Sequence, residues 1–178
     1  MNTTEKTNML VKMALLSAIS IVLMVLIRIP APPPVTFLVY DPADIPILLA
    51  AFAFGPIAGL MVTAVVSVIQ AFPMGGDGII GFSMHMLATG AFVIVAGNIY
   101  RRNKTKKTAL IAMILGAVAM VATMGMWNIL ITPIYMGVPR QVVIQLLPAI
   151  LAFNVVKAAV NGVVTFLIYK PLSRFLHR

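Results

Sequence analysis

Long apolar runs recur along this 178-residue chain, and they constrain its fold more than any other feature. An α-helix needs about 20 predominantly apolar residues to cross a bilayer. We predict six spans, over residues 9–27, 45–54, 57–72, 79–100, 108–131 and 148–169; the second is short because Phe54-Gly55-Pro56 breaks it. Charged residues make up only 10% of the chain, against about 25% in a soluble domain. We therefore predict a single domain: an all-α integral membrane protein folded as a six-helix bundle.

The basic residues predict the orientation of this bundle. The net charge is +9, and Lys and Arg gather before the first span, in the loop RRNKTKK at 101–107 and after the last span, up to Arg174 and Arg178. Cytoplasmic segments of membrane proteins carry such an excess of Lys and Arg. We therefore expect both chain ends inside the cell, which agrees with an even number of spans. We interpret the clusters as topology determinants that touch anionic lipid, and we predict no nucleic-acid partner.

Missing residue types exclude several kinds of chemistry. The chain has no cysteine, so it has no disulfide and no thiolate chemistry. It has no phosphate-binding glycine loop ending in Lys-Ser or Lys-Thr, so it does not hydrolyse ATP by that route. The acidic residues number four, and we predict no metal site; they are Glu5, Asp41, Asp44 and Asp77.

The segment PPPVTFLVYDPADIPILLAAFAFGP at 32–56 places two aspartates and several prolines before an apolar run. With the basic clusters inside the cell, this loop lies on the outer face. Asp44 is a suitable N-cap, and Pro46 in the first turn loses no hydrogen bond, because first-turn N–H groups have no helical partner. We therefore predict that Asp44 caps the second helix and that Asp41, before Pro42, forms a turn.

Lys157 is the sharpest polar feature within the apolar runs. It lies twelve residues before Tyr169, or about 18 Å along a helix, so its side chain cannot easily reach the membrane surface. A central lysine costs on the order of 2.5–3.5 kcal/mol on insertion scales, so it should face a protein interior or an aqueous cavity. Asn154 and Asn161 share its helical face. The three form either a helix–helix hydrogen-bond cluster or a ligand site. We favour the ligand site, because we expect no intramembrane carboxylate to pair with Lys157.

Other polar residues in the runs allow more than one role. His85 could contact a ligand, carry a proton or donate between helices, and Ser67 and Gln70 are equally ambiguous. Asn128 lies toward the outer end of the fifth span, beside Trp127, whose position is typical of an interfacial aromatic.

In the first span, Ala14 and Ala18 lie four residues apart, with Ser17 between them. Small residues at this spacing let a second helix approach closely within lipid. The pattern is common in membrane helices, so alone it does not assign a partner.

Several motifs, taken in order, resemble one transporter family. They are ALLSAI at 14–19, YDPADIP at 40–46, FGPIAG at 54–59, WNILITPIYMG at 127–137 and FNVVKA at 153–158. Together they resemble the substrate-binding S components of energy-coupling factor (ECF) vitamin transporters, and most of all the riboflavin-specific members. The resemblance covers nearly the whole chain.

The resemblance implies a vitamin site near the outer face of a six-helix bundle, in the plasma membrane of a prokaryote. Riboflavin would be the transported ligand, and no cofactor would be bound covalently. By motif match the helical asparagines and the lysine would contact the flavin ring, and the loop residues would cover it. The predicted substrate-binding residues are Asn128, Asn154, Lys157, Leu38, Val39, Tyr40 and His85.

The resemblance also implies partners. In this family the alanine-rich face of the first helix docks on a membrane T subunit, which carries two ATPases. The predicted docking residues are therefore Ala14 and Ala18. The chain itself would be a transport subunit and not an enzyme.

Two departures from the riboflavin pattern leave alternatives open. Ser67 and Val68 stand where riboflavin members often carry Lys-Asn, and His85 replaces an asparagine. An S component for another vitamin or precursor is one alternative. From other classes, a small ion-driven secondary transporter with His85 as proton carrier and a structural membrane subunit also stay open.

Overall fold

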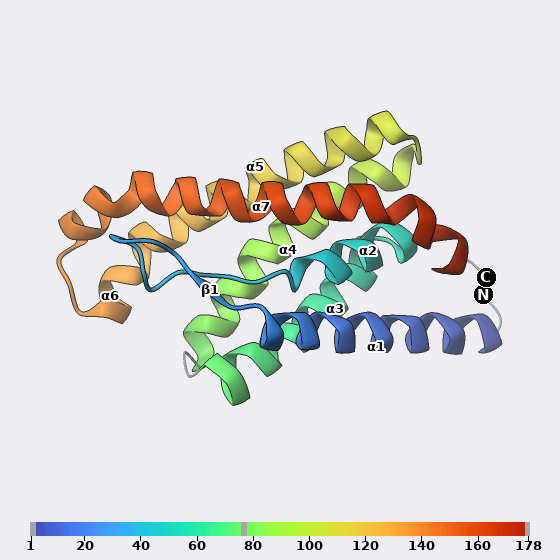
Figure 1. Cartoon of the computed structure of the whole chain (residues 1–178), viewed down its shortest axis with the longest axis horizontal. Coiled ribbons are helices and arrows are strands. Elements are labelled where there is room, and N and C mark those ends of the chain that lie inside the picture. Colours follow the sequence, from blue (N-terminus) through green and yellow to red (C-terminus); the bar gives the residue numbers. More distant parts are fainter. Residues whose placement is uncertain (1–2, 76–77, 177–178) are drawn as a thin grey trace.

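The computed structural model describes residues 3–75 and 78–176, and nearly all of them are helical (Figure 1). In chain order the elements are α1 (Thr3–Leu26), β1 (Ile29–Pro30), β2 (Val39–Tyr40), α2 (Asp44–Phe54), α3 (Pro56–Ile69), the π-helix η1 (Gln70–Gly75), α4 (Gly78–Arg102), α5 (Lys106–Leu130), α6 (Thr132–Met136) and α7 (Arg140–Leu176). The two short strands pair antiparallel, with Ile29 opposite Tyr40. The fold is therefore all-α, as the apolar runs predict.

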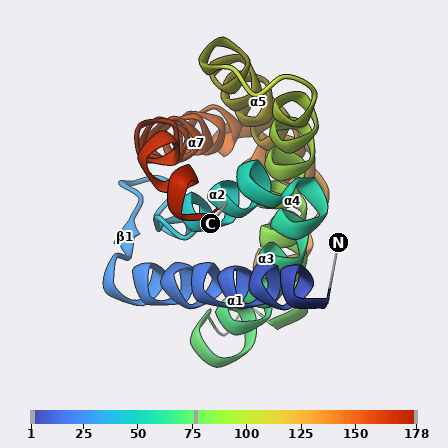
Figure 2. The same ribbon diagram turned by 90° about the vertical axis from the view of Figure 1, so that its right-hand side faces the viewer.

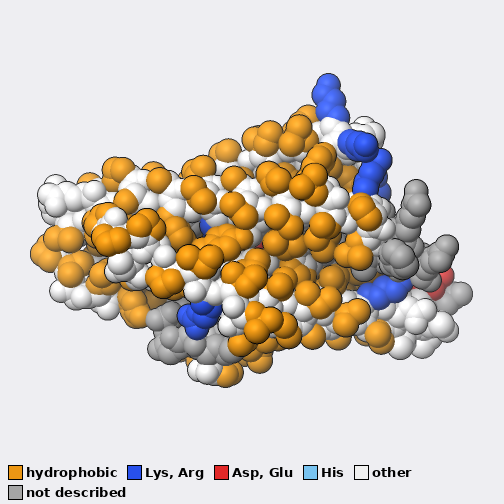
Figure 3. Space-filling model, in the orientation of Figure 1, with side chains coloured by type: hydrophobic (Ala, Val, Ile, Leu, Met, Phe, Trp, Pro, Cys, Tyr) orange, Lys and Arg blue, Asp and Glu red, His pale blue; other side chains and the backbone are white. Residues whose placement is uncertain are grey.

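The outer surface of the bundle is that of a membrane protein. Within the described residues, five helices are long and apolar enough to cross a bilayer: α1, α3 with the start of η1, α4, α5 and α7. Figure 3 shows hydrophobic side chains over most of the face in view, a surface that suits hydrocarbon and not water. The remaining apolar helix, α2, has 11 residues, fewer than the roughly 17 that a span requires. The number of six spanning helices therefore stays a prediction.

Both chain ends lie at one end of the bundle, together with the junction of α4 and α5 (Figure 1). Lys and Arg side chains gather there, at the right-hand end of the space-filling view (Figure 3). We call this the basic end; α6 lies at the opposite end. Asp77 and Arg178, which the sequence places in a turn and in the C-terminal basic cluster, lie outside the described residues, as does the side chain of Arg174.

The short helix α2 lies at the centre of the bundle. Each of its residues from Asp44 to Ala53 is buried, and the helix contacts α1, α3, α4 and α7 (Figure 2). It ends at Gly55, whose φ of 98° lies in the region that favours glycine, and Pro56 opens α3. The Phe-Gly-Pro break predicted from the sequence is this corner.

Small residues set the distances between the central helices. A Cβ on Gly59 of α3 would lie 2.7 Å from Ala51 Cβ and 2.7 Å from Val93 Cγ1, and a Cβ on Gly116 of α5 would collide with the ring of Phe92. Helices in lipid associate through such close packing, because lipid offers no hydrophobic drive between them. The close approach of α2, α3, α4 and α5 therefore depends on residues without side chains.

Residues 27–43, which we call the strap, run from the end of α1 to the start of α2. The strap's apolar side chains Ala31, Val35 and Leu38 pack with Val143 and Ile150 of α7 in a second hydrophobic cluster, separate from the main core. Within the strap, β1 pairs with β2, and the Ala31 amide donates to the Leu38 carbonyl at 2.8 Å. The strap is therefore an ordered segment that lies against α7.

The helix α7 is longer than predicted. The sequence places a helix start at Pro148, but α7 begins at Arg140 and continues through this proline. Its 37 residues span about 55 Å, more than the roughly 30 Å of the hydrocarbon core. Prolines are tolerated inside membrane helices because neighbouring groups satisfy the freed carbonyl. The additional turns carry Val143, against which the strap packs.

Two glycine substitutions test the packing of the central helices. Gly59→Ala places a methyl group 2.7 Å from two side chains, whereas the nearest atom to a Cβ on Gly90 lies 3.4 Å away, at the tip of Leu60. Both changes gain up to about 1 kcal/mol of helix propensity, but overpacking costs roughly 1–3 kcal/mol. We expect Gly59→Ala to lower the midpoint of thermal unfolding in detergent and Gly90→Ala to leave it unchanged or raise it. Equal midpoints for the two variants would show that α2, α3 and α4 are not in tight contact.

Candidate functional site

A cluster of buried polar side chains lies where the strap meets α2, α4 and α7. Ionisable groups inside a membrane are costly and almost always face a protein interior or a cavity, where they mark a functional site. Each member must therefore be satisfied by a partner or by a ligand. The members are Asp41, Asp44, His85, Thr89, Lys157 and Asn161, all of them buried.

Lys157 pairs with a carboxylate of the strap. Its ammonium donates to Asp41 Oδ2 at 3.0 Å, and both side chains are almost fully enclosed. The expectation that Lys157 has no carboxylate partner inside the membrane is therefore wrong. The sequence predicts that Asp41 forms a turn on the outer face, but the strap folds inward at this point. Its other oxygen accepts from the Ala43 amide at 3.1 Å, so the carboxylate both forms the local turn and neutralises Lys157.

Asp44 does not cap α2 with its side chain. The N-cap position is Ala43, and no side chain makes a capping hydrogen bond there. Instead the Asp44 carboxylate accepts from Thr89 Oγ1 at 2.7 Å and from Asn161 Nδ2 at 2.9 Å. The prediction of a helix cap is wrong because α4 and α7 supply stronger partners for a carboxylate in the interior. Asp44 thus connects the central helix to both of these helices.

Asn161 ties the strap to α7 a second time. Its amide also reaches the backbone carbonyl of Asp41 at 3.3 Å, and its side-chain oxygen accepts from the Tyr40 hydroxyl at 3.0 Å. Burial raises the pKa of the Tyr40 phenol above its ordinary value. The hydroxyl is therefore protonated at neutral pH and keeps its role as donor.

A cavity of about 100 Å³ lies beside this cluster, between the strap, η1, α4, α5 and α7. The structure brings five of the seven predicted substrate-binding residues to its wall: Leu38, Val39, His85, Asn154 and Lys157. Asp41 and Gln70 line it as well. The cavity therefore combines apolar walls with convergent polar groups, which is the usual composition of a small-molecule site.

Two buried polar atoms in the wall of this cavity have no hydrogen-bond partner among the described residues. They are Gln70 Oε1 and His85 Nε2. The other ring nitrogen of His85 lies 2.9 Å from Ser67 Oγ, and Nε2 lies 3.5 Å from Asp44 Oδ1. An unsatisfied buried polar atom costs about 1–3 kcal/mol. A ligand that reached either atom would relieve this cost.

Asn128 and Tyr40 do not line the cavity. Asn128 is buried near the end of α5, where its amide donates to the Met124 carbonyl at 2.8 Å and its side-chain oxygen accepts from Thr132 at 2.9 Å. Met124, one turn earlier, does line the cavity. Asn128 therefore lies adjacent to the site. Tyr40 lies in the strap and is connected to α7 by its hydrogen bond to Asn161.

Sequence reasoning missed the part that Asp41 plays, although the motif YDPADIP contains it. Gln70 was noted as polar but was not assigned to the site. Within residues 3–75 and 78–176, no three His, Cys, Asp or Glu side chains are grouped in a way that could hold a metal ion.

A comparison with protein families identifies the family of this chain. The family described as "ECF transporter, substrate-specific component" matches residues 8–171, which is nearly the whole chain. The chain belongs to this family. The family resemblance carried by the ordered motifs is thereby confirmed, and we refer to the protein as an S component from here on.

Known relatives of this S component match it from end to end. The riboflavin transporter RibU of Staphylococcus aureus is 30% identical over 100% of both chains. The riboflavin transporter FmnP of Bacillus subtilis is 28% identical over 97% of this chain and 96% of its own. Among solved structures, the S component of a bacterial ECF transporter is 29% identical and superposes with a TM-score of 0.84 over 97% of this chain and 99% of that one.

The Lys157–Asp41 pair can be tested by a double-mutant cycle. Lys157→Met leaves the Asp41 carboxylate buried without its cation, and losing one partner of a buried pair costs roughly 3–5 kcal/mol. We expect Lys157→Met and Asp41→Asn each to lower the midpoint of thermal unfolding in detergent. The double variant should lose much less than the sum of the two. Additive losses would show that the two groups do not interact.

Proposed function

We propose that this S component binds riboflavin and delivers it to a partner T subunit that carries two ATPases, in the plasma membrane of a prokaryote. The observation that carries the proposal is the cavity at Lys157 and Asn154 beneath the strap, in a chain similar over its full length to riboflavin transporters. In this proposal the chain has no catalytic residue and binds no cofactor covalently. ATP is hydrolysed by the partner subunits.

The donors and acceptors of the site suit the pyrimidine edge of a flavin, which alternates carbonyl acceptors with an N–H donor. Lys157 has three N–H donors and Asp41 accepts from one, so two stay available for flavin carbonyls. The Asn154 amide nitrogen donates to the Ile150 carbonyl at 2.8 Å, so its side-chain oxygen is the acceptor for the flavin N–H. The Asn128 amide keeps one N–H for the ligand beyond its bond to Met124.

The strap acts as the lid of the site. A cavity of about 100 Å³ is smaller than the roughly 300–1,000 Å³ of most ligand pockets, so a tricyclic ring enters only when the part of the strap before Asp41 moves outward. Leu38, Val39 and Tyr40 then close over the ring. His85 and Gln70 line the same cavity, and each has a buried atom without a hydrogen-bond partner; in this proposal both contact the ligand.

The orientation follows from the charge distribution. The basic end, with both termini, lies in the cytoplasm, and the strap and α6 lie on the outer side. In this arrangement α2 completes a six-helix bundle of a single membrane domain, although its own length is short of a full span. The vitamin site then opens toward the outer face.

The outward face of α1 is suited to a membrane partner. Ala14 and Ala18 are exposed, and Val11, Val22 and Val25 continue the same exposed stripe. α1 packs on α2 and α3 through its opposite face, which includes Met13 and Leu16. Small side chains at the middle of the stripe permit close approach of another helix. We assign this face to docking of the T subunit.

Ligand identity is tested by titrating riboflavin, thiamine and biotin into the purified protein. We expect saturable quenching of flavin fluorescence at one riboflavin per chain, because the ring is buried beside Tyr40. Asn154→Ala should weaken binding roughly 2- to 13-fold, the effect of one hydrogen bond. Asn98→Ala is the matched control: Asn98 donates to Ile94 O with the same geometry but is exposed. Binding of another vitamin in place of riboflavin would assign a different ligand to this S component, and no saturable binding at all would contradict the proposal.

Docking is tested with bulky residues on α1. Ala14→Trp with Ala18→Trp should bind riboflavin normally but fail to co-purify with the T subunit and the ATPases, and should fail in ATP-dependent uptake into vesicles. The control is Ile111→Trp with Leu115→Trp, two exposed residues one turn apart on α5. Normal assembly of the α1 variant would remove this face as the docking surface. Uptake without any ATPase would indicate an ion-driven transporter instead.

A further inference from the structure

A second cavity lies at the basic end, far from the vitamin site. It has a volume of about 200 Å³ and is formed by the ends of α2 and α4, the start of α5 and the last turns of α7. Phe52 stacks on Tyr100 at a ring distance of 4.3 Å, and Tyr169 meets both rings edge-on. These aromatic rings form one wall of the cavity. The vitamin-binding proposal assigns no role to this part of the molecule.

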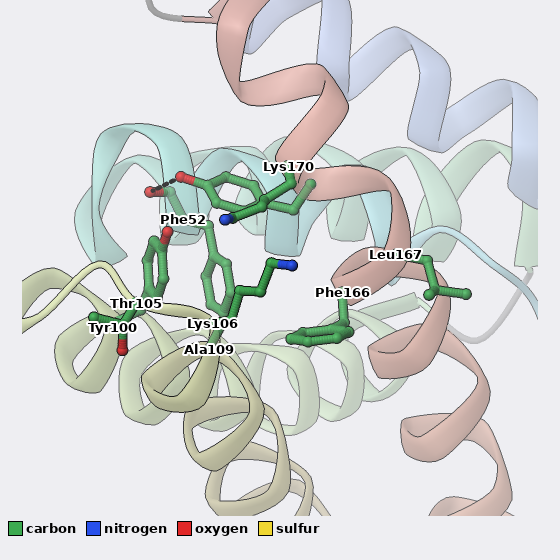
Figure 4. Close-up of a pocket in the computed structure, with 9 residues that line it drawn as sticks. Phe52, Tyr100, Thr105, Lys106, Ala109, Phe166, Leu167 and Lys170 are labelled. Carbon is green, nitrogen blue, oxygen red and sulfur yellow. Dashed lines mark hydrogen bonds between the residues drawn. The ribbon is translucent and has the colours of Figure 1, made fainter.

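Two lysines from different helices face this cavity. Figure 4 shows the ammonium groups of Lys106, on α5, and Lys170, on α7, both turned toward the space between these helices. Lys106 also lies in the first turn of α5, after the N-cap Thr105, where the helix dipole adds positive potential. The two ammonium groups and the start of α5 together give this cavity a positive potential. The cavity is therefore suited to an anionic group.

A separate apolar groove lies next to this cavity, along the membrane-facing side of α5 and α7. It has a volume of about 570 Å³, and Phe166 lines both spaces. The groove runs from Leu110 to Ala122 on α5 and from Leu151 to Phe166 on α7. Twelve residues of helix correspond to about 18 Å, which is just over half of the roughly 30 Å hydrocarbon core. The groove is therefore as long as one leaflet is deep.

We propose that the cavity and the groove together bind one anionic phospholipid of the leaflet at the basic end. The phosphate lies between the ammonium groups of Lys106 and Lys170, and one acyl chain lies in the groove between α5 and α7. The two spaces adjoin at Phe166, which favours a lipid over a free phosphate ion, because a free ion leaves the apolar groove without an occupant. Basic pockets between membrane helices on the cytoplasmic side bind anionic headgroups in this way.

The proposal is tested by native mass spectrometry of the full chain in detergent, with phosphatidylglycerol and phosphatidylcholine that carry the same acyl chains. We expect the first phosphatidylglycerol to bind at least tenfold more tightly than phosphatidylcholine. Lys106→Gln with Lys170→Gln should weaken phosphatidylglycerol about 25-fold, or about fivefold for each lysine near an anionic surface, and should remove the preference. Lys104→Gln with Lys107→Gln changes the net charge equally in the same region and should leave both affinities within twofold.

The groove is tested separately. Ala122→Phe with Ala159→Phe fills it, because both residues are exposed and line it, and should weaken both lipids without changing their ratio. Excess inorganic phosphate should not displace phosphatidylglycerol. Unchanged unfolding midpoints establish that the variants are folded. Equal binding of the two lipids, an equal loss in the Lys104 and Lys107 control, or displacement by phosphate alone would each overturn the proposal.

Discussion

The ion pair between Lys157 and Asp41 is the interaction on which the rest of the site depends. Either charge alone would be costly in the interior of a membrane protein, and the strap reaches inward far enough to place Asp41 3.0 Å from the Lys157 ammonium. Once it does, Tyr40 and Asp44 come within reach of Asn161. The ion pair thus holds the end of the strap at Asp41, next to the start of the central helix and to the face of α7 that lines the cavity.

The frame around this pair is rigid for a different reason. The central helix α2 is buried along its length, and α3, α4 and α5 approach one another at glycines where a Cβ would collide. Such packing holds helices together in lipid, because an apolar side chain is as stable against lipid tails as against another helix. The carboxylate of Asp44 adds polar connections to α4 and α7. The cavity beside Lys157 therefore has closely packed helices on one side and the strap on the other, and in the proposed function the strap is the part that moves.

The sequence predicts those features that local pattern determines. Apolar runs predict the membrane helices, Phe-Gly-Pro predicts the corner at Gly55, and the spacing of Asn154 and Lys157 predicts their common face. The roles of Asp41 and Asp44 could not be predicted, because they depend on a strap that folds back between helices far apart in the chain. The prediction that a helix begins at Pro148 is wrong, because α7 continues through this proline. Neighbouring groups in a membrane protein satisfy the carbonyl that a proline leaves unpaired, and the local sequence does not show them. Gln70 joins the site through the π-helix after α3, and no periodicity in the sequence indicates that turn.

An experimental structure of the purified S component with riboflavin bound tests the central claim most directly. The account predicts that the pyrimidine edge of the flavin lies within hydrogen-bond distance of Lys157 Nζ and of the Asn154 side chain. It also predicts that the Lys157–Asp41 pair is retained and that Leu38, Val39 and Tyr40 cover the ring. A flavin bound elsewhere in the bundle, or a complex in which Lys157 keeps Asp41 as its only partner and does not touch the ligand, would contradict it.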